Sequence, residues 1–232
     1  LAPLAARTDV DFRSWWVVLA DERVVPADSP DCNALALRQA FLAQAGVPEA
    51  QILRCAEGLT PELAATDYSG QLLRLSQRRT DKGRPVLPLA PVPPTESPQP
   101  ALDLVVLGVG PDGHVASLFP NSQLLSLDAE GGAWVHAIRD SPKPPPERIT
   151  LSRAALEAAE RVLVVALGAG KAEIAQRALE VQSLPGALPV QLLSPRGGLR
   201  WILDAEAASK LSLEAWTAKT RKSPFPRSNV KL

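Results

Sequence analysis

Apolar residues along the chain gather into short runs, each followed by a polar or glycine-rich turn and then by helix-like spacing. Repetition of this pattern is typical of parallel strands joined by crossover helices. It predicts an α/β protein with a doubly wound, mostly parallel sheet flanked by helices. The predicted strands are Trp15–Ala20, a run within LDLVVLGVGPDGH, Ala133–Ile138, Val162–Leu167 and Leu199–Leu203.

Helical spacing of apolar residues occurs in several stretches between these runs. A helix is also predicted after Asp204, which is a favourable N-cap residue. The predicted helices are Asn33–Ala45, Pro61–Arg78, Arg153–Glu160, a helix opened by Lys171, and Ala205–Leu211.

The pattern predicts one α/β domain over residues 1–216. Lys82–Pro100 carries seven prolines, which rule out a regular helix or a central strand. We expect a surface loop there, because runs of the same kind flank it. Residues 217–232 predict a mobile, basic C-terminal tail.

Charge and composition narrow the classes of partner. Lys plus Arg and Asp plus Glu both number 25, so the net charge is zero. No overall basic field favours nucleic acid or anionic lipid, and no apolar run reaches the ~18 residues of a membrane span. Two cysteines, Cys32 and Cys55, are too few for a disulfide scaffold and favour a reducing compartment. We therefore expect a cytoplasmic protein with a small-molecule partner, as a monomer, with a dimer as the alternative.

Charged and glycine-rich segments follow three of the predicted strands. They are Asp21–Arg23, Gly108–His114 and Gly168–Lys171. In open α/β sheets, ligands bind beyond the carboxyl ends of the strands, so these segments predict one shared site. For each turn alone, glycines that make a tight bend and solvated charges explain the sequence equally well.

A nucleotide site is the first alternative, because Gly108, Gly110 and Gly113 have the G-x-G-x-x-G spacing. Pro111 inside the turn and Pro120 soon after it leave no long helix for a pyrophosphate. GAGK lacks the earlier glycine of a P-loop. The two histidines do not have the ligand spacing of a metal site. The sequence therefore predicts neither a cofactor nor a metal.

General acid–base chemistry remains. His114 lies in the glycine-rich loop and can take a proton from water at neutral pH, and Asp112 is placed to orient its imidazole. His136 alternates within an apolar strand and is interpreted as structural. Because no G-x-S-x-G motif occurs, a water nucleophile is favoured over an acyl-enzyme.

Anion binding has separate candidates. Lys143 and Arg148 flank a triple proline, and Lys171 opens a helix whose N-terminal amides favour phosphate. For Lys143, a solvated loop lysine is an equal alternative. Gly110 and Gly113 are expected to bend the loop against the substrate.

Four motifs together resemble the 6-phosphogluconolactonases, a family that also contains glucosamine-6-phosphate deaminase. They are LADERVVPADSPDCN, LGVGPDGHVASLFP, DSPKPPPERITLS and ALGAGKAEIAQRAL, in the same order between about Trp15 and Leu211. The resemblance implies the sugar-phosphate isomerase type of fold and cofactor-independent hydrolysis of 6-phospho-D-glucono-1,5-lactone.

The resemblance also implies roles for individual residues. His114 matches the proposed base, with Asp112 and Arg23 beside it. Arg148 and Lys171 match phosphate contacts, and Asp21 and Glu22 are expected to support the site. Members of the family begin with a further strand and a Gly-Gly-Ser phosphate loop. Nothing upstream of Trp15 matches these, so we expect either that the sequence is truncated before Leu1 or that this part of the phosphate pocket is absent.

Two other functions compete with lactone hydrolysis. A glucosamine-6-phosphate deaminase carries Phe-Asn-Glu after its Asp-Gly-His, and Tyr after its Asp-Glu pair. Here Ser117-Leu118-Phe119 and Arg23 stand in those places. A non-catalytic phosphosugar-binding domain is disfavoured by the acid–base pair and by the lack of a helix-turn-helix segment.

Overall fold

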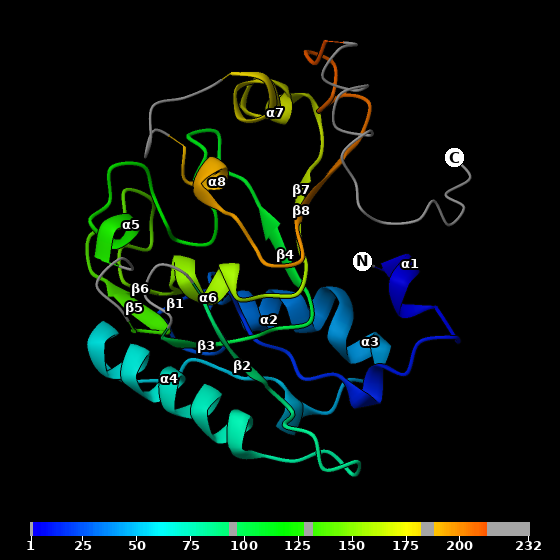
Figure 1. Cartoon of the computed structure of the whole chain (residues 1–232), viewed down its shortest axis with the longest axis vertical. Helices are drawn as coiled ribbons and strands as arrows, with labels where there is room; N and C mark the ends of the chain where they lie inside the picture. The colour runs from blue at the N-terminus through cyan, green and yellow to red at the C-terminus, as the bar shows by residue number, and fades with distance from the viewer. Residues whose placement is uncertain (1, 93–96, 128–131, 182–187, 213–232) are drawn as a thin grey trace.

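The computed structural model describes residues 2–92, 97–127, 132–181 and 188–212, with parallel and antiparallel sheets among helices (Figure 1). A parallel sheet contains β4 (Val105–Gly108), β7 (Val162–Ala166) and β8 (Leu199–Leu203) in the order β4-β7-β8. Its strands lie where short, mostly apolar runs predicted them. The α/β class is therefore confirmed, and the parallel arrangement holds for this sheet.

The second sheet is antiparallel, unlike the single mostly parallel sheet that the sequence predicted. It contains β1 (Asp21–Arg23), β6 (Arg148–Leu151) and β5 (Val135–Ile138) in the order β1-β6-β5. Strand β5 was predicted, whereas β6 was not. A ladder of this kind places Arg23 directly opposite Arg148.

The strand predicted at Trp15–Ala20 is wrong. Within it, Val17 alone forms a bridge, parallel to Ile52, with backbone bonds to Gln51 and Leu53. The regular strand begins at Asp21, where the backbone pairs with β6. The acidic and basic residues expected beyond a strand end therefore lie within β1.

Helices flank the sheets. Helix α4 (Pro61–Gln77) runs along the antiparallel sheet, while α7 (Ala172–Glu180) lies at the opposite end of the molecule, beyond β7 (Figure 1). Asn33–Ala45 is helical throughout, as α2 (Asn33–Leu37), a π-helical turn η2 (Arg38–Leu42) and α3 (Ala43–Ala45). The other helices are α1 (Ala2–Ala5), α5 (Leu124–Leu127), α6 (Arg153–Glu157), α8 (Pro189–Leu192), and the short 3-10 turns η1 (Phe12–Ser14), η3 (Glu49–Gln51) and η4 (Ala169–Lys171).

Local chemistry explains where the helices begin. Thr60 caps α4 by accepting from the Leu63 amide, and Pro61 takes the first helical position, where a missing N–H costs nothing. Ser152 caps α6 in the same way, through the Ala155 amide. The predicted starts of both helices are confirmed.

The proline-rich segment and the residues after β8 differ from the sequence prediction. The proline-rich segment contains a two-stranded ribbon of β2 (Leu89–Pro91) and β3 (Pro98–Pro100), with prolines at the strand ends. Ala205–Leu211 is not a regular helix: residues 205–210 form turns, in which Ser209 and Leu211 donate to the carbonyls of Glu206 and Ala208, three residues earlier. The predicted tail, 217–232, lies outside the described residues.

The main core joins both sheets to α4. Tyr68 of this helix is fully buried, and its hydroxyl oxygen accepts a 2.7 Å bond from the Leu19 amide, just before β1. This bond therefore ties α4 to the segment that leads into β1. Among the described helices, none combines the length and apolarity that crossing a bilayer requires.

Candidate active site

The loop after β4 is bent so that its own residues touch. The Gly110 amide donates to the His114 carbonyl at 2.9 Å, and the Gly113 amide donates to Gly110 at 3.0 Å. Gly113 has a φ of +85°, which glycine adopts without strain. A Cβ at Gly110 would lie 2.0 Å from Nδ1 of His114. Both glycines are therefore required for this close turn.

The loop brings the predicted acid and base together. Oδ1 of Asp112 lies 2.5 Å from Nδ1 of His114. An ionised carboxylate only accepts hydrogen bonds, so this contact requires the proton on Nδ1. Nε2 is then the nitrogen with a free lone pair. The His114 side chain is 17% exposed and lies against Phe119, with ring centroids 4.6 Å apart.

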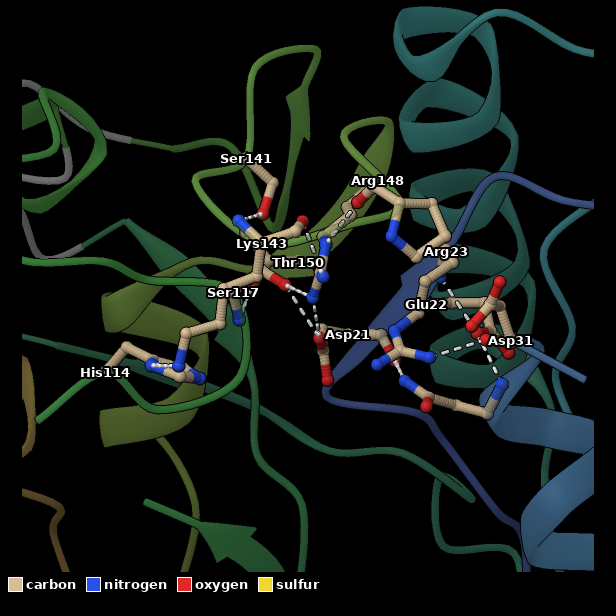
Figure 2. A network of polar contacts seen from close by, with 12 residues as sticks. Asp21, Glu22, Arg23, Asp31, His114, Ser117, Ser141, Lys143, Arg148 and Thr150 are labelled. Atoms are coloured by element: carbon tan, nitrogen blue, oxygen red, sulfur yellow. Dashed lines mark hydrogen bonds and ion pairs between the residues drawn. The ribbon is translucent and has the colours of Figure 1, made fainter. Parts of the chain in front are cut away.

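A lysine from another loop completes this cluster. Nζ of Lys143 lies 3.4 Å from Nδ1 of His114 and 3.8 Å from Oδ1 of Asp112. Because Asp112 already accepts the Nδ1 proton, the lysine contributes mainly as a positive charge. In Figure 2 its side chain reaches towards His114.

The environment of the pair keeps it in the state that a base needs. Burial is the main cause that lowers the pKa of His114, and the Lys143 charge adds to it against the opposing effects of Asp112 and Asp21. Burial acts to raise the pKa of Asp112, but the hydrogen bond and charge of His114 outweigh it and the net shift is downward. At neutral pH the imidazole is neutral beside an ionised carboxylate.

A buried polar cluster links the His114 loop to the antiparallel sheet. The Ser117 hydroxyl donates a 2.7 Å bond to Oδ2 of Asp21 on β1 and accepts a 3.3 Å bond from Nη1 of Arg148 on β6. The same Arg148 nitrogen lies 3.9 Å from Asp21. Thr150 accepts from the Ser117 amide at 3.3 Å. Figure 2 shows this cluster between His114 and Arg23.

Arg148 is 4% exposed, and its guanidinium is held by protein atoms. Nε donates to the Pro145 carbonyl at 2.9 Å, and Nη2 donates to the carbonyls of Lys143 and Pro144, each at 3.0 Å. Burial and the neighbouring Arg23 lower the pKa of the Arg148 guanidinium. The donors that the sequence assigned to a phosphate thus face the proline loop.

Arg23 and Glu22, neighbours on β1, have different surroundings. Nη1 of Arg23 donates to the Asp31 carbonyl at 2.6 Å, while its Nε is buried without a hydrogen-bond partner. Glu22 is 1% exposed, and its carboxylate accepts from the amides of Arg23, Asn33 and Ala34 at 2.7–2.8 Å. Glu22 therefore caps α2, and the Arg23 guanidinium is held by the Asp31 backbone.

Lys171 lies just before α7 and bonds to the loop that follows β4. Its Nζ donates a 2.8 Å bond to the Val109 carbonyl. The amides expected to hold phosphate here are partly occupied, because Gly168 donates to the Asp204 carboxylate and Ala169 to that of Glu206. The lysine ammonium, rather than this group of amides, is the feature left to meet an anion.

Sequence reasoning missed Ser117, Phe119 and Thr150 as parts of the site. Ser117 and Phe119 lie three and five residues after His114. The side-chain partners of Ser117 come from β1 and β6, whereas Phe119 contacts His114 and Arg148. Within the described segments, no three His, Cys, Asp or Glu side chains gather as metal ligands would. His136 lies half-buried on β5, opposite Thr150.

Comparisons with known proteins cover this whole site. A family model described as glucosamine-6-phosphate isomerases/6-phosphogluconolactonase matches residues 1–201. The chain is 39% identical to 6-phosphogluconolactonase of Rattus norvegicus over 91% of this chain and 74% of that protein. It is 38% identical to a probable chloroplastic 6-phosphogluconolactonase of Oryza sativa subsp. indica, over 88% of this chain and 59% of the relative. The solved 6-phosphogluconolactonase of Trypanosoma brucei has a TM-score of 0.66 and 31% identity, covering 83% of this chain and 73% of its own.

Proposed function

The chain belongs to the family of glucosamine-6-phosphate isomerases and 6-phosphogluconolactonases, and we propose that it hydrolyses 6-phospho-D-glucono-1,5-lactone to 6-phospho-D-gluconate. The single observation that carries this proposal is the Asp112–His114 pair. Its 2.5 Å contact leaves Nε2 of a neutral imidazole free to activate water. The named relatives support the choice of substrate.

In the proposed reaction, Nε2 of His114 takes a proton from a water molecule as its oxygen attacks the lactone carbonyl. The carbonyl carbon becomes tetrahedral and its oxygen negative. Collapse of this intermediate breaks the bond to the ring oxygen, which receives the proton from His114. Asp112 stabilises the imidazolium between these two steps, so no cofactor enters the reaction.

Positive groups around the pair are proposed to hold the negative substrate. Arg23 is proposed to stabilise the oxyanion through its guanidinium charge, because donors aimed at developing charge lower the barrier. Lys171 is proposed to meet the phosphate as a point charge, while the Lys143 ammonium stays beside His114 and Asp112. Gly110 and Gly113 keep the loop backbone close to the lactone.

The chain is proposed to act on its small-molecule substrate as a monomer in the cytoplasm, without nucleic acid or membrane partners. Cys32 and Cys55 are both free thiols, which fits a reducing compartment.

The test is hydrolysis of freshly generated lactone by the purified chain, with the spontaneous rate subtracted. His114→Ala should lower kcat by about 100-fold or more if the imidazole is the general base, while His136→Ala should leave it within about twofold. A chain that does not hydrolyse the lactone would contradict the function. An active His114→Ala variant would contradict the base alone.

A further inference from the structure

The guanidinium of Arg148 is already hydrogen-bonded to protein atoms, which leaves it few donors for a ligand. Four of its five N–H groups have a named acceptor in the protein: three backbone carbonyls and the Ser117 hydroxyl. Nη1 of Arg148 also lies 3.9 Å from Oδ2 of Asp21, whose negative charge partly balances that of the guanidinium. A phosphate that reached this guanidinium would have to displace bonds already made in a buried place.

The three carbonyls belong to consecutive residues, Lys143, Pro144 and Pro145. Prolines have no N–H, so this loop cannot be held by a regular backbone ladder. Its other local bonds are from the Lys143 amide to the Ser141 hydroxyl at 3.3 Å and from the Ser141 amide to Pro146 at 3.1 Å. Bonds from Arg148 are therefore the main restraint on the backbone that carries Lys143.

The other end of Lys143 lies at the acid–base pair, 3.4 Å from His114 and 3.8 Å from Asp112. Arg148 also lies over the Phe119 ring, 6.0 Å from its centroid, and His114 packs against the same ring, with centroids 4.6 Å apart. The guanidinium thus supports both partners of the Lys143–His114 contact, one through the loop and one through the aromatic ring.

We propose that Arg148 is a positioning residue, which holds the Lys143–Pro145 carbonyls and the Ser117 hydroxyl so that the Lys143 ammonium stays beside Asp112 and His114. This role rests on the proposed function only for its effect on turnover. It replaces the direct phosphate contact predicted from the sequence. The charge that Arg148 places is the one that helps to keep His114 unprotonated.

The groups that face His114 can be named. They are Asp112 from its own loop, Lys143 from the loop before β6 and Asp21 from β1, while Arg148 contacts the Phe119 ring that His114 also contacts. Arg148→Lys keeps the charge but cannot reach three carbonyls at once. Lys143→Met removes the charge at a half-exposed position. Arg139→Lys is the matched control, because Arg139 is 57% exposed and pairs with the exposed carboxylates of Glu62 and Glu147 rather than with a group of the cluster.

The first experiment needs no catalysis. Nuclear magnetic resonance follows the imidazole titrations, which are readily resolved because the chain has two histidines. Lys143→Met should raise the pKa of His114, Arg148→Lys should raise it as well, and the double variant should match Lys143→Met. Arg139→Lys should leave it unchanged. An unchanged His114 titration in Arg148→Lys, or shifts that add in the double variant, would overturn the proposal.

The second experiment compares the phosphorylated lactone with unphosphorylated glucono-1,5-lactone. Arg148→Lys should lower kcat for both by a similar factor, of the order of tenfold, with KM for the phosphorylated substrate within about twofold. A rise in KM confined to the phosphorylated lactone would instead show a direct phosphate contact. Wild-type chain that hydrolyses neither lactone would contradict the proposed function, and the titrations would still test Arg148.

If Arg148→Lys does not fold, as judged by near-ultraviolet circular dichroism of the tryptophans, the wild-type chain supplies the test. The Nε–H of Arg148 should be protected from hydrogen exchange, with or without saturating inorganic phosphate. Rapid exchange of this proton would overturn the proposal, because it would show that the bond to Pro145 is not kept.

Discussion

Nδ1 of His114 and Oδ1 of Asp112 lie 2.5 Å apart within a single turn of the chain. The pair needs no help from a distant element to form, because the intervening Gly113 allows the backbone to fold back at a φ of +85°. The surroundings of the pair come from Phe119, which packs against the imidazole ring, and from Lys143, whose ammonium lies beside Nδ1. The contact therefore fixes the tautomer locally, and the surrounding fold sets the proton affinity.

Asp112→Asn should lower kcat by about 100-fold or more, with a smaller change in KM. An amide can donate to Nδ1, which would place the imidazole proton on Nε2 and remove the lone pair that water needs. Steady-state kinetics on the lactone measure both constants. Asp103→Asn, at an exposed position before β4, is the control and should behave as wild type. Full activity of Asp112→Asn would exclude a tautomer-fixing role.

The pH profile should show one ionisation below the ordinary histidine value. The base acts when neutral, and burial lowers its pKa, so kcat/KM should rise with pH through that lowered pKa and be level above about 6.5. Activity should fall on the acid side only after the free histidine value has been passed. An inflection clearly above 6.5 would contradict a desolvated His114 as the base, and Lys143→Met should move the inflection upward.

Gly110→Ala should abolish most activity while the fold persists. The added Cβ would lie 2.0 Å from Nδ1 and 2.1 Å from Cε1 of His114, so the imidazole must leave its position beside Asp112. Displacement of a catalytic group by about 1 Å costs about 100-fold in rate. Gly170→Ala is the matched control, since its Cβ would meet nothing within 4 Å. Equal activities for the two variants would show that the His114 geometry is not needed.

Glu22→Gln tests a residue that the sequence grouped with the site but that the structure makes a helix cap. One side-chain oxygen would become an NH2 that faces backbone donors, at a position 1% exposed. The free energy of unfolding should fall by about 1–3 kcal/mol, as measured by urea denaturation, while kcat of the remaining folded protein changes little. Glu160→Gln, on the surface, should leave stability unchanged. A large loss of kcat without loss of stability would instead place Glu22 in the chemistry.

The parallel strands β4, β7 and β8 could be predicted because each coincides with a short, mostly apolar run rich in Val, Leu and Ile. The strand at Arg148–Leu151 could not, since it begins with a charged residue after prolines and gains its identity from pairing with β1 and β5. Conversely, Trp15–Ala20 has the apolar content of a strand, but its only bridge is at Val17.

The same distinction separates the parts of the site. Asp112 and His114 could be found from spacing, because they are two residues apart. The Ser117–Asp21 bond joins positions 96 residues apart, and the Ser117–Arg148 bond joins positions 31 apart. No local pattern in a single sequence marks such pairs. The carbonyls that Arg148 bonds are only three to five residues away, but the turn that brings them to the guanidinium has no pattern of its own in the sequence.

Lys171 offers the clearest separation of phosphate binding from loop support. Its ammonium donates to the Val109 carbonyl at 2.8 Å, next to Gly110, and is also the proposed partner of the phosphate. If it binds phosphate, Lys171→Met should raise KM for the phosphorylated lactone by roughly tenfold and leave unphosphorylated glucono-1,5-lactone unaffected. If it only holds the loop, kcat should fall alike for both substrates. Lys210→Met, at an exposed lysine on the turn after β8, controls for loss of a surface charge. An equal fall for both lactones would remove Lys171 from the phosphate site, because a lost contact to the phosphate cannot be felt by a substrate that lacks one.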